Sequence, residues 1–388
     1  MYQPATYNYL PHERVVYGQP AAGAVASETK RLHAKRVLLV TSKSVARTKM
    51  LAGIADALED RLAGTFDECI AHTPRQCVID AAAAARDVEA DLIVTVGGGS
   101  VVDAAKALLV CLAEGIEDAE ALGTYRVQVD AEGRRRVPPI GPMQVRQIVV
   151  PTTLSGAEFS NLAGVTDTTR GVKDAFTADQ MAARAVILDP EATLETPEWL
   201  WLSTAIRSID HAVETICSTA PQPLADAGAS QALWMLTAAL PASKQDPANL
   251  QARLGCQLAV WLATVGLNRV PYGASHGIGH QLGAVAGVPH GHCSCVLLPA
   301  VMRYNAEVNA ERQTMVAAAM GAPKTSAAEA IEKLVRDLGQ PTRLRDVGVK
   351  PEQFDTIAQS SLDNIFVRSN PRPITEATQI VDILRSAW

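Results

Sequence analysis

The sequence is poor in aromatic residues and has no excess of basic ones. Phe, Trp and Tyr make up only 4% of the 388 residues, so alanine, valine and leucine must form most of the core. The net charge is −6, which excludes the broadly basic surface that nucleic-acid-binding proteins use. The short basic run at 134–136 is better explained as a solvated loop. We therefore expect no nucleic-acid partner.

Cysteine pairs and membrane-targeting segments are also lacking. The seven cysteines are odd in number, and none belongs to a Cys-x-x-Cys pair. This favours free thiols in a reducing, cytoplasmic setting. The first residues do not combine a charged segment with an apolar one, as a signal peptide would. No apolar run is long enough to span a membrane. We expect a cytoplasmic protein with no membrane partner.

The N-terminal half alternates short apolar strands with helices. Strands are predicted at 13–18, 35–42, 64–70, 92–96, 147–153 and 185–190, and helices at 22–32, 46–63 and 77–89. This alternation is typical of a doubly wound α/β domain with a mainly parallel sheet. The strand at 92–96 is apolar except for Thr95, the pattern of parallel strands that are buried on both faces. A polar stretch at about 115–146 interrupts the pattern and is interpreted as an insertion.

The C-terminal half contains almost only helical patterns. They occur at 197–218, 224–240, 247–266, 273–284, 292–308, 310–320, 324–338 and 374–386. A chain of this length is long enough for two domains. We predict an α/β domain over residues 1–192 and an all-helical domain over 193–388. A cleft between two domains is a favoured place for a small-molecule site.

A glycine-rich turn directly follows the strand at 92–96 and opens a helix. It consists of Gly97, Gly98, Gly99 and Ser100. Backbone N–H groups at such a helix start, together with the helix dipole, suit a pyrophosphate. The turn differs from the usual G-x-G-x-x-G pattern, and a purely structural tight turn is the alternative interpretation.

Four of the eight histidines lie between residues 271 and 305. His276 and His280 are four residues apart and so share one face of a helix, and His290 follows ten residues later. His211 lies upstream on another predicted helix. Such clusters are typical of metal ligation or of proton transfer near neutral pH. The alternative is a set of hydrogen-bonded core histidines, but the many glycines around them favour close approach of backbone or ligand.

Several motifs, in this order, resemble those of the iron-containing alcohol dehydrogenase family. They are GGGSVVDAAK, PTT, the helix with HAVE, SHGIGHQLG, and PHG followed by LLPAVMRYN. The resemblance implies the fold of that family, which glycerol dehydrogenase and dehydroquinate synthase share. HTP at 72–74 and LGQPTRLRDVGV at 338–349 are similar to the maleylacetate reductase branch. Its members reduce maleylacetate to 3-oxoadipate with NADH or NADPH, in the breakdown of aromatic rings.

The resemblance implies a role for each residue that matches a family motif. The implied cofactor residues are Gly97, Gly98, Gly99 and Ser100 at the pyrophosphate, Asp103 in the same motif, Thr152 and Thr153 beside the nicotinamide, and Lys173 near the ribose. His211, His276 and His290 match three of the four metal ligands. His280 matches a histidine beside the nicotinamide that is proposed to relay protons. All four histidines are therefore catalytic candidates.

One departure from the family pattern concerns the metal. The family's fourth metal ligand, an aspartate, lies four residues before His211, where this sequence has Arg207. Arginine is permanently cationic and has no lone pair for a metal. Asp210 is a poor substitute, because neighbouring residues on a helix point about 100° apart. We expect no bound metal and interpret Arg207 as a catalytic candidate that binds a substrate carboxylate or a developing anion. The alternative is that Arg207 turns outward into a surface ion pair.

A second departure concerns the choice between NADH and NADPH. Family members selective for NAD often have an acidic residue just after the first strand, where it holds the ribose hydroxyls. This sequence has Ser42 there, followed by Lys43, which could meet a 2′-phosphate. Either cofactor is therefore compatible with the sequence, and Ser42 is included among the cofactor residues.

The leading prediction is an NAD(P)H-dependent reductase of a small carboxylate substrate, acting as a homodimer. Hydride would pass from the nicotinamide to an electrophilic carbon, with the protein supplying orientation and charge stabilisation. The alternative is a metal-dependent alcohol dehydrogenase, in which His211, His276 and His290 hold the ion. A non-catalytic nucleotide-binding scaffold is a third interpretation, which the retained histidines disfavour.

Overall fold

The computed structural model describes residues 2–130 and 135–388, which divide into two compact units. One unit is Tyr9–Thr196, and the other joins residues 2–8 to Pro197–Trp388. The sequence analysis ended the first domain at residue 192 and included the N-terminal residues in it. Residues 2–8 group with the second unit because the Tyr2 hydroxyl donates to Asp226 Oδ2 and the Tyr7 hydroxyl donates to the carbonyl of Val265, both at 2.9 Å.

The first unit is built on a six-stranded parallel sheet. Its strands are β1 (Arg14–Tyr17), β2 (Val37–Val40), β3 (Leu62–Phe66), β4 (Leu92–Gly97), β7 (Arg146–Pro151) and β10 (Ala185–Leu188), in the order β1-β10-β7-β4-β2-β3. Every residue of β2, β4 and β10 is buried, as their continuous apolar runs predict. Parallel pairing gathers the carboxyl ends of the strands at one edge, where ligands bind in open α/β sheets. The predicted α/β class is confirmed.

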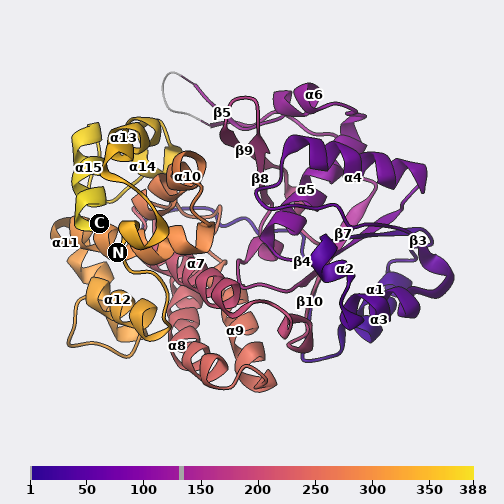
Figure 1. The fold of residues 1–388 in the computed structure, drawn as a ribbon, viewed down its shortest axis with the longest axis horizontal. Helices are drawn as coiled ribbons and strands as arrows, with labels where there is room; N and C mark the ends of the chain where they lie inside the picture. The colour runs from indigo at the N-terminus through magenta and orange to yellow at the C-terminus, as the bar shows by residue number, and fades with distance from the viewer. Residues whose placement is uncertain (1, 131–134) are drawn as a thin grey trace. The chain divides into compact units, whose positions relative to one another are not determined.

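Helices cover both faces of this sheet (Figure 1). The helices are α1 (Ala21–Arg31), α2 (Lys43–Ala46), α3 (Lys49–Leu58), α4 (Arg75–Asp87) and α5 (Gly99–Glu114). Alternate residues of β2 enter different cores, as the pleat of a strand requires. Val37 and Leu39 pack with α1 and α3, whereas Leu38 and Val40 pack with α4 and α5. The sheet is therefore buried from both sides.

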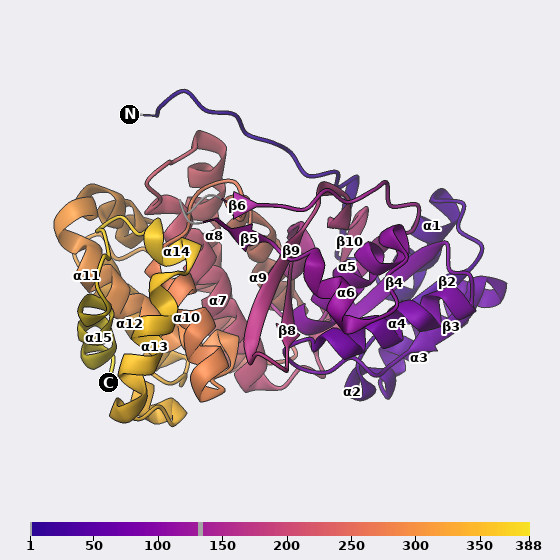
Figure 2. The same cartoon turned by 90° about the horizontal axis from the view of Figure 1, so that it is seen from above.

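A β-hairpin lies outside this sheet and was not predicted. It consists of β8 (Leu162–Asp167) and β9 (Val172–Thr177), which pair antiparallel (Figure 2). Ala163, Val165 and Phe176 are buried against the core that contains α5. The alternation of buried and partly exposed residues in β8 is a strand signal, but it is only six residues long and contains a glycine.

In the predicted insertion at 115–146, the described residues form one short helix and two very short strands. They are α6 (Ala119–Thr124), β5 (Gln128–Val129) and β6 (Arg135–Arg136), the strands pairing antiparallel. Residues 131–134, which include the first arginine of the basic run, lie outside the described residues.

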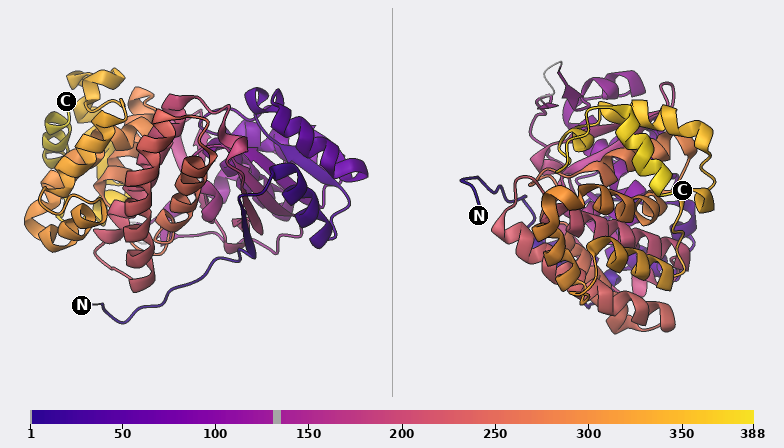
Figure 3. Two further views of the ribbon diagram at one scale, coloured as in Figure 1. Left: turned by 90° about the horizontal axis from the view of Figure 1, so that it is seen from below. Right: turned by 90° about the vertical axis from the view of Figure 1, so that its left-hand side faces the viewer.

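The second unit is helical (Figure 3), and residues 197–388, all of which are described, contain no strand. Its helices are α7 (Glu198–Ile216), α8 (Pro223–Gln245), α9 (Leu250–Ala263), α10 (Ala274–Ala286), α11 (His290–Ala319), α12 (Ala327–Asp337), α13 (Phe354–Leu362), α14 (Ile365–Arg368) and α15 (Ala377–Ser386). The helices predicted at 292–308 and 310–320 are both part of α11, with Asn309 in a non-helical conformation between them. The short helices α13 and α14 were not predicted. None of the helices in the described ranges is long and apolar enough to cross a membrane.

Candidate active site

The glycine turn lies where β4 passes into α5. Gly98 caps the helix, and Gly97 has a φ of +155°. An added Cβ at Gly98 would lie 2.9 Å from Cγ2 of Thr153, and one at Gly99 would lie 2.9 Å from Oγ of Ser155. The turn is therefore in close contact with the segment that follows β7. The first N–H groups of the 16-residue helix α5 emerge here, which makes this end of the sheet suited to an anion.

Other residues predicted to bind the cofactor follow the two neighbouring strands. Pro151 of β7 lies opposite Gly97 of β4, so Thr152 and Thr153 come directly beside the glycine turn. The Thr152 N–H donates to the Gly97 carbonyl at 3.0 Å. Ser42 caps α2 just beyond the end of β2, on the other side of β4. The sheet thus brings these residues to one edge.

Asp103 and Lys173 meet at the hairpin. The Gly164 N–H donates to Asp103 Oδ2 at 3.0 Å, and the side chain of Lys173 passes over Gly164, where an added Cβ would overlap its Cε. Burial raises the pKa of Asp103, while Lys106 and Lys173 act in the opposite direction. Asp103 therefore links α5 to β8, a structural task that the sequence motif alone does not reveal.

An acidic residue that the sequence analysis missed lies beside Ser42. Ser42 forms an isolated bridge with Glu68, and Glu68 Oε2 lies 2.8 Å from Nζ of the exposed Lys43. The hydrogen bond that the Lys43 ammonium donates to this carboxylate raises the pKa of Lys43. Glu68 follows β3, and only the pairing of β2 with β3 brings it near the position where the resemblance implies the adenosine ribose. Near this ribose position there is therefore both an acidic side chain, Glu68, and a basic one, Lys43.

In the helical unit, His211 on α7 and His276 on α10 face one another. Nε2 of His276 lies 2.9 Å from Nδ1 of His211, and Nδ1 of His276 lies 2.7 Å from Oε2 of Glu214. The ring of Tyr272 packs against both histidines, with centroid distances of 4.7 Å to His276 and 5.8 Å to His211. All four side chains are buried.

Two buried carboxylates support His276, and the sequence analysis assigned neither to the site. Glu214 accepts hydrogen bonds from the backbone N–H groups of Gly273 and Ser275, at 3.0 and 2.9 Å. Asp210 Oδ1 lies 3.5 Å from Nδ1 of His276. Burial and Arg207 lower the pKa of His276, but the two carboxylates raise it by more, so its pKa lies above the usual value.

Asp210 was predicted from the helix angle to be a poor substitute for the missing ligand, yet it lies beside a histidine of the cluster. Its neighbour in the cluster is His276 on α10, not the adjacent His211, so the angle between successive residues of α7 does not decide the matter. Asp210 Oδ2 accepts hydrogen bonds from the hydroxyls of Ser275 and Ser294, at 2.8 and 2.6 Å. Glu214 could have been identified more easily from the sequence, because it lies one turn after Asp210 on the same helix face.

Arg207 turns toward these carboxylates. Its Nη1 lies 3.2 Å from Ser294 Oγ and 3.6 Å from Asp210 Oδ2, and its side chain is only 12% exposed. The alternative of an outward-facing surface ion pair was therefore wrong. Although burial raises the pKa of Asp210, His276 and Arg207 lower it to about 2.

His280 and His290 form a second pair. Their ring centroids are 6.3 Å apart, and the ring of Phe366 lies 5.6 Å from that of His280. Nδ2 of Asn364 lies 3.5 Å from Nδ1 of His280. The sequence analysis missed Asn364 and Phe366 because they belong to or cap the unpredicted helix α14.

Two family models together match most of the chain. One, described as iron-containing alcohol dehydrogenase, matches residues 11–190. The other, described as Fe-containing alcohol dehydrogenase family, C-terminal, matches residues 202–388. The chain belongs to the iron-containing alcohol dehydrogenase family. It is accordingly an oxidoreductase, as its relatives are.

Individual relatives of this family member match along nearly their whole length. Dehydrogenase FUM7 of Gibberella moniliformis is 33% identical, over 96% of this chain and 95% of the relative. Maleylacetate reductase 1 of Cupriavidus pinatubonensis is 27% identical, over 99% and 97%. The crystal structure of maleylacetate reductase from Agrobacterium tumefaciens has a TM-score of 0.82 and 28% identity, covering 100% of this chain and 98% of that one. The predicted family and fold are confirmed.

The metal that the family name implies fits the donor set of this chain poorly. Among the described residues, the group of possible ligands whose donor atoms all lie within 4.8 Å of one another is Asp210, Glu214 and His276, without the implied His290. Asp210 and Glu214 already accept several hydrogen bonds, and the guanidinium of Arg207 lies beside them. Asp210 Oδ1 is buried and accepts no hydrogen bond from the described residues, whereas the other carboxylate oxygens would have to give up theirs. A divalent cation would also lie next to the fixed positive charge of Arg207.

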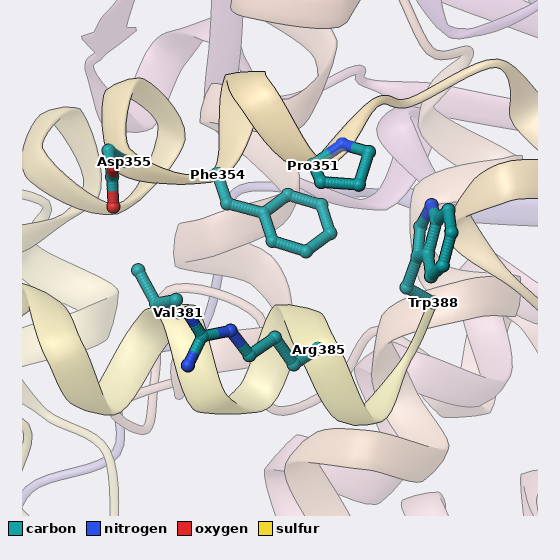
Figure 4. Close-up of a pocket in the computed structure, with 6 residues that line it drawn as sticks. All are labelled: Pro351, Phe354, Asp355, Val381, Arg385 and Trp388. Atoms are coloured by element: carbon teal, nitrogen blue, oxygen red, sulfur yellow. The ribbon is translucent and has the colours of Figure 1, made fainter.

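A cavity of about 320 Å³ elsewhere in the helical unit contains none of the predicted site residues. Figure 4 shows its lining, which is Pro351, Phe354, Asp355, Val381, Arg385 and Trp388. It offers no histidine, and we assign it no catalytic role in this dehydrogenase family member.

The crowding at Gly98 generates a prediction about cofactor binding. Gly98→Val should weaken NAD(P)H binding by at least about tenfold, or 1.4 kcal/mol, because its side chain would press on Thr153 and keep phosphate from the backbone. Fluorescence titration measures the Kd, and circular dichroism checks the fold. Gly23→Ala is the matched control, since nothing lies within 4 Å of a Cβ there. An unchanged Kd in Gly98→Val would remove the turn from the site.

The pair of Lys43 and Glu68 generates a prediction about cofactor preference. Glu68→Gln should shift the ratio of the two Kd values toward NADPH by roughly two- to fivefold, the effect of one exposed charge. The reason is that the variant removes a negative charge that pairs with Lys43 and repels a 2′-phosphate, and so leaves Lys43 for that phosphate. Glu89→Gln, at another exposed acid of the same unit, should leave the ratio unchanged. The same ratio in both variants would exclude Glu68 as a determinant.

Proposed function

We propose that this family member is an NAD(P)H-dependent reductase that reduces maleylacetate, or a closely related oxo-acid, to 3-oxoadipate or its analogue without a bound metal. Hydride passes from the nicotinamide to an electrophilic carbon of the substrate, and the cofactor supplies the redox chemistry. The observation that carries the proposal is Arg207, a largely buried permanent cation next to Asp210 and one turn before His211.

Arg207 has the properties needed to bind a carboxylate. Its guanidinium presents five N–H donors in a planar fork, more than its contacts with Ser294 and Asp210 use. These contacts hold the side chain in one orientation, so less conformational entropy is lost when a ligand binds. Conjugate addition of hydride to the carbon β to a carbonyl leaves an enolate, whose α carbon then takes up a proton. A guanidinium can stabilise the negative charge of that enolate as well as grip a carboxylate through two hydrogen bonds.

The proposal also includes a substrate class, a cellular environment, a quaternary structure and a metabolic role. The substrate is a small carboxylate, and the seven cysteines, all free and buried, support a reducing, cytoplasmic environment. The resemblance to maleylacetate reductases supports a homodimer and a role in the breakdown of aromatic compounds.

One observation favours a second candidate, a metal-dependent alcohol dehydrogenase. The 2.7 Å contact between Glu214 and Nδ1 of His276 is the arrangement in which a carboxylate orients a metal-binding histidine. In this alternative, His211, His276 and His290 would hold a divalent ion that polarises the substrate oxygen. Arg207 is the observation against it.

The two candidates differ in their response to chelation and to loss of Arg207. We expect chelator-treated enzyme to reduce maleylacetate with NADH or NADPH. Arg207→Ala should raise KM or lower kcat by about ten- to a hundredfold, the value of a hydrogen-bonded charge pair, without changing the Kd of the cofactor. Arg336→Ala, at an exposed arginine of α12, is the control.

Metal analysis of the purified protein can contradict this proposal. Stoichiometric iron or zinc in the purified protein, with activity lost to chelator and restored by metal, would overturn the metal-free proposal and establish the alcohol dehydrogenase alternative.

His280 is the candidate for proton transfer. His280→Ala should lower kcat by about 10²–10⁴, the usual contribution of general acid–base catalysis, and should leave the Kd of the cofactor nearly unchanged. His292→Ala serves as the control, because His292 belongs to the same segment but packs against Trp199. Steady-state kinetics decide the matter, and a near-normal kcat in His280→Ala would make this histidine structural.

A further inference from the structure

Lys106 is a fully buried lysine whose ammonium group is completely hydrogen-bonded. It projects from α5 and is 0% exposed. Its Nζ donates to the carbonyl of Ala157 at 2.5 Å, to Oγ of Ser160 at 3.0 Å and to the carbonyl of Leu162 at 2.9 Å. A charged ammonium has three N–H donors, and each of them has one of these acceptors as its partner. This match between donors and acceptors exists only while Lys106 is charged.

The three acceptors belong to the segment that connects β7 with β8. The first part of this segment forms one wall of the glycine turn, where Thr153 meets Gly98 and Ser155 meets Gly99. Ala157 belongs both to the wall of the glycine turn and to the acceptors of Lys106. Its Cβ is 3.7 Å from an added Cβ at Gly99, and its carbonyl accepts a hydrogen bond from Lys106. The end of β7 holds one side of this wall, and Lys106 holds the other.

The charge on Lys106 is costly, which points to a purpose beyond packing. Burial lowers its pKa to about 8, although Asp103 from α5 and Glu158 from the short 3₁₀ turn at Ala157–Phe159 both raise it. Burial also raises the pKa of Glu158 to about 7, and Lys173 of β9 acts on Asp103. A methionine of similar length would fill the same space without the desolvation of an ammonium.

We propose that Lys106 is a positioning residue for the cofactor, whose ammonium clamps residues 157–162 so that Thr153 and Ser155 stay against the glycine turn and shape the pyrophosphate site. This inference rests on the cofactor part of the proposed function. A neutral amine has only two donors and loses the charge assistance, so it must release one acceptor and hold the others less strongly.

The clamp predicts that cofactor affinity and protein stability change with pH in opposite directions. Lys106 is charged below about pH 8 and neutral above it, so affinity for NADH should fall as pH rises from about 7 to 9.5. The pKa of the folded protein lies below the usual 10.5, so between these values the unfolded chain binds more protons. The contribution of Lys106 to stability therefore rises with pH in this window.

The test is a titration of full-length protein with NADH and with NADPH at pH 7, 8 and 9.5, followed by fluorescence. Neither probe titrates in this range, since a phosphate has its second pKa near about 6. In the wild type we expect the Kd to rise at least threefold from pH 7 to 9.5. In Lys106→Met we expect a Kd raised about tenfold already at pH 7 and constant with pH. Lys30→Met, at an exposed lysine of α1, should keep the wild-type profile.

The outcomes separate this inference from the proposed function. A wild-type Kd that is constant with pH, or a Lys106→Met variant that keeps the wild-type Kd or its pH step, overturns the clamp and leaves cofactor binding intact. If Lys106→Met does not fold, the wild-type pH profile alone decides, with thermal melts showing whether a loss of affinity is mere unfolding. A wild type that binds neither NADH nor NADPH overturns both.

Discussion

Charged side chains that are removed from water must find partners, and this requirement shapes both units of the protein. In the first unit, Lys106 is buried among backbone carbonyls with Asp103 and Glu158 nearby. In the second, Arg207 and His276 are buried with Asp210 and Glu214. Each group ties together segments that are far apart in the sequence. Neither group is needed for a hydrophobic core, so each specifies the place of a loop or helix that carries functional residues.

The identity of the cation in the second group has chemical consequences. A metal ion accepts lone pairs from several directions and can exchange with solvent, whereas a guanidinium is covalently attached and offers only donors in one plane. The ion can therefore bind an alcohol oxygen directly, while Arg207 can only donate hydrogen bonds, which are strongest to groups that are already anionic or become so. In the proposed function, the arginine at position 207 thus changes which substrates the histidine-containing helices can serve.

The features predicted correctly from the sequence have strong local signals. The strand at 92–96 is apolar except for Thr95, and three consecutive glycines between a strand and a helix are a strong signal for a tight turn. The features that were missed depend on contacts between distant segments. Glu68 reaches Ser42 only through the pairing of β2 with β3, and Asp210 is judged wrongly when α7 is considered without α10. The hairpin of β8 and β9 and the short helices α13 and α14 have patterns too brief to distinguish from loops.

The chain segments that make up each unit also determine the order in which the two units can be completed during synthesis. Tyr9–Thr196 is continuous and has its own cores, so it can fold as soon as it has emerged. Residues 2–8 add two hydrogen bonds to the second unit. The partners of Tyr2 and Tyr7 are Asp226 and Val265, which are synthesised 224 and 258 residues later. Residues 2–8 can therefore form these contacts only after residues 226 and 265 have been synthesised.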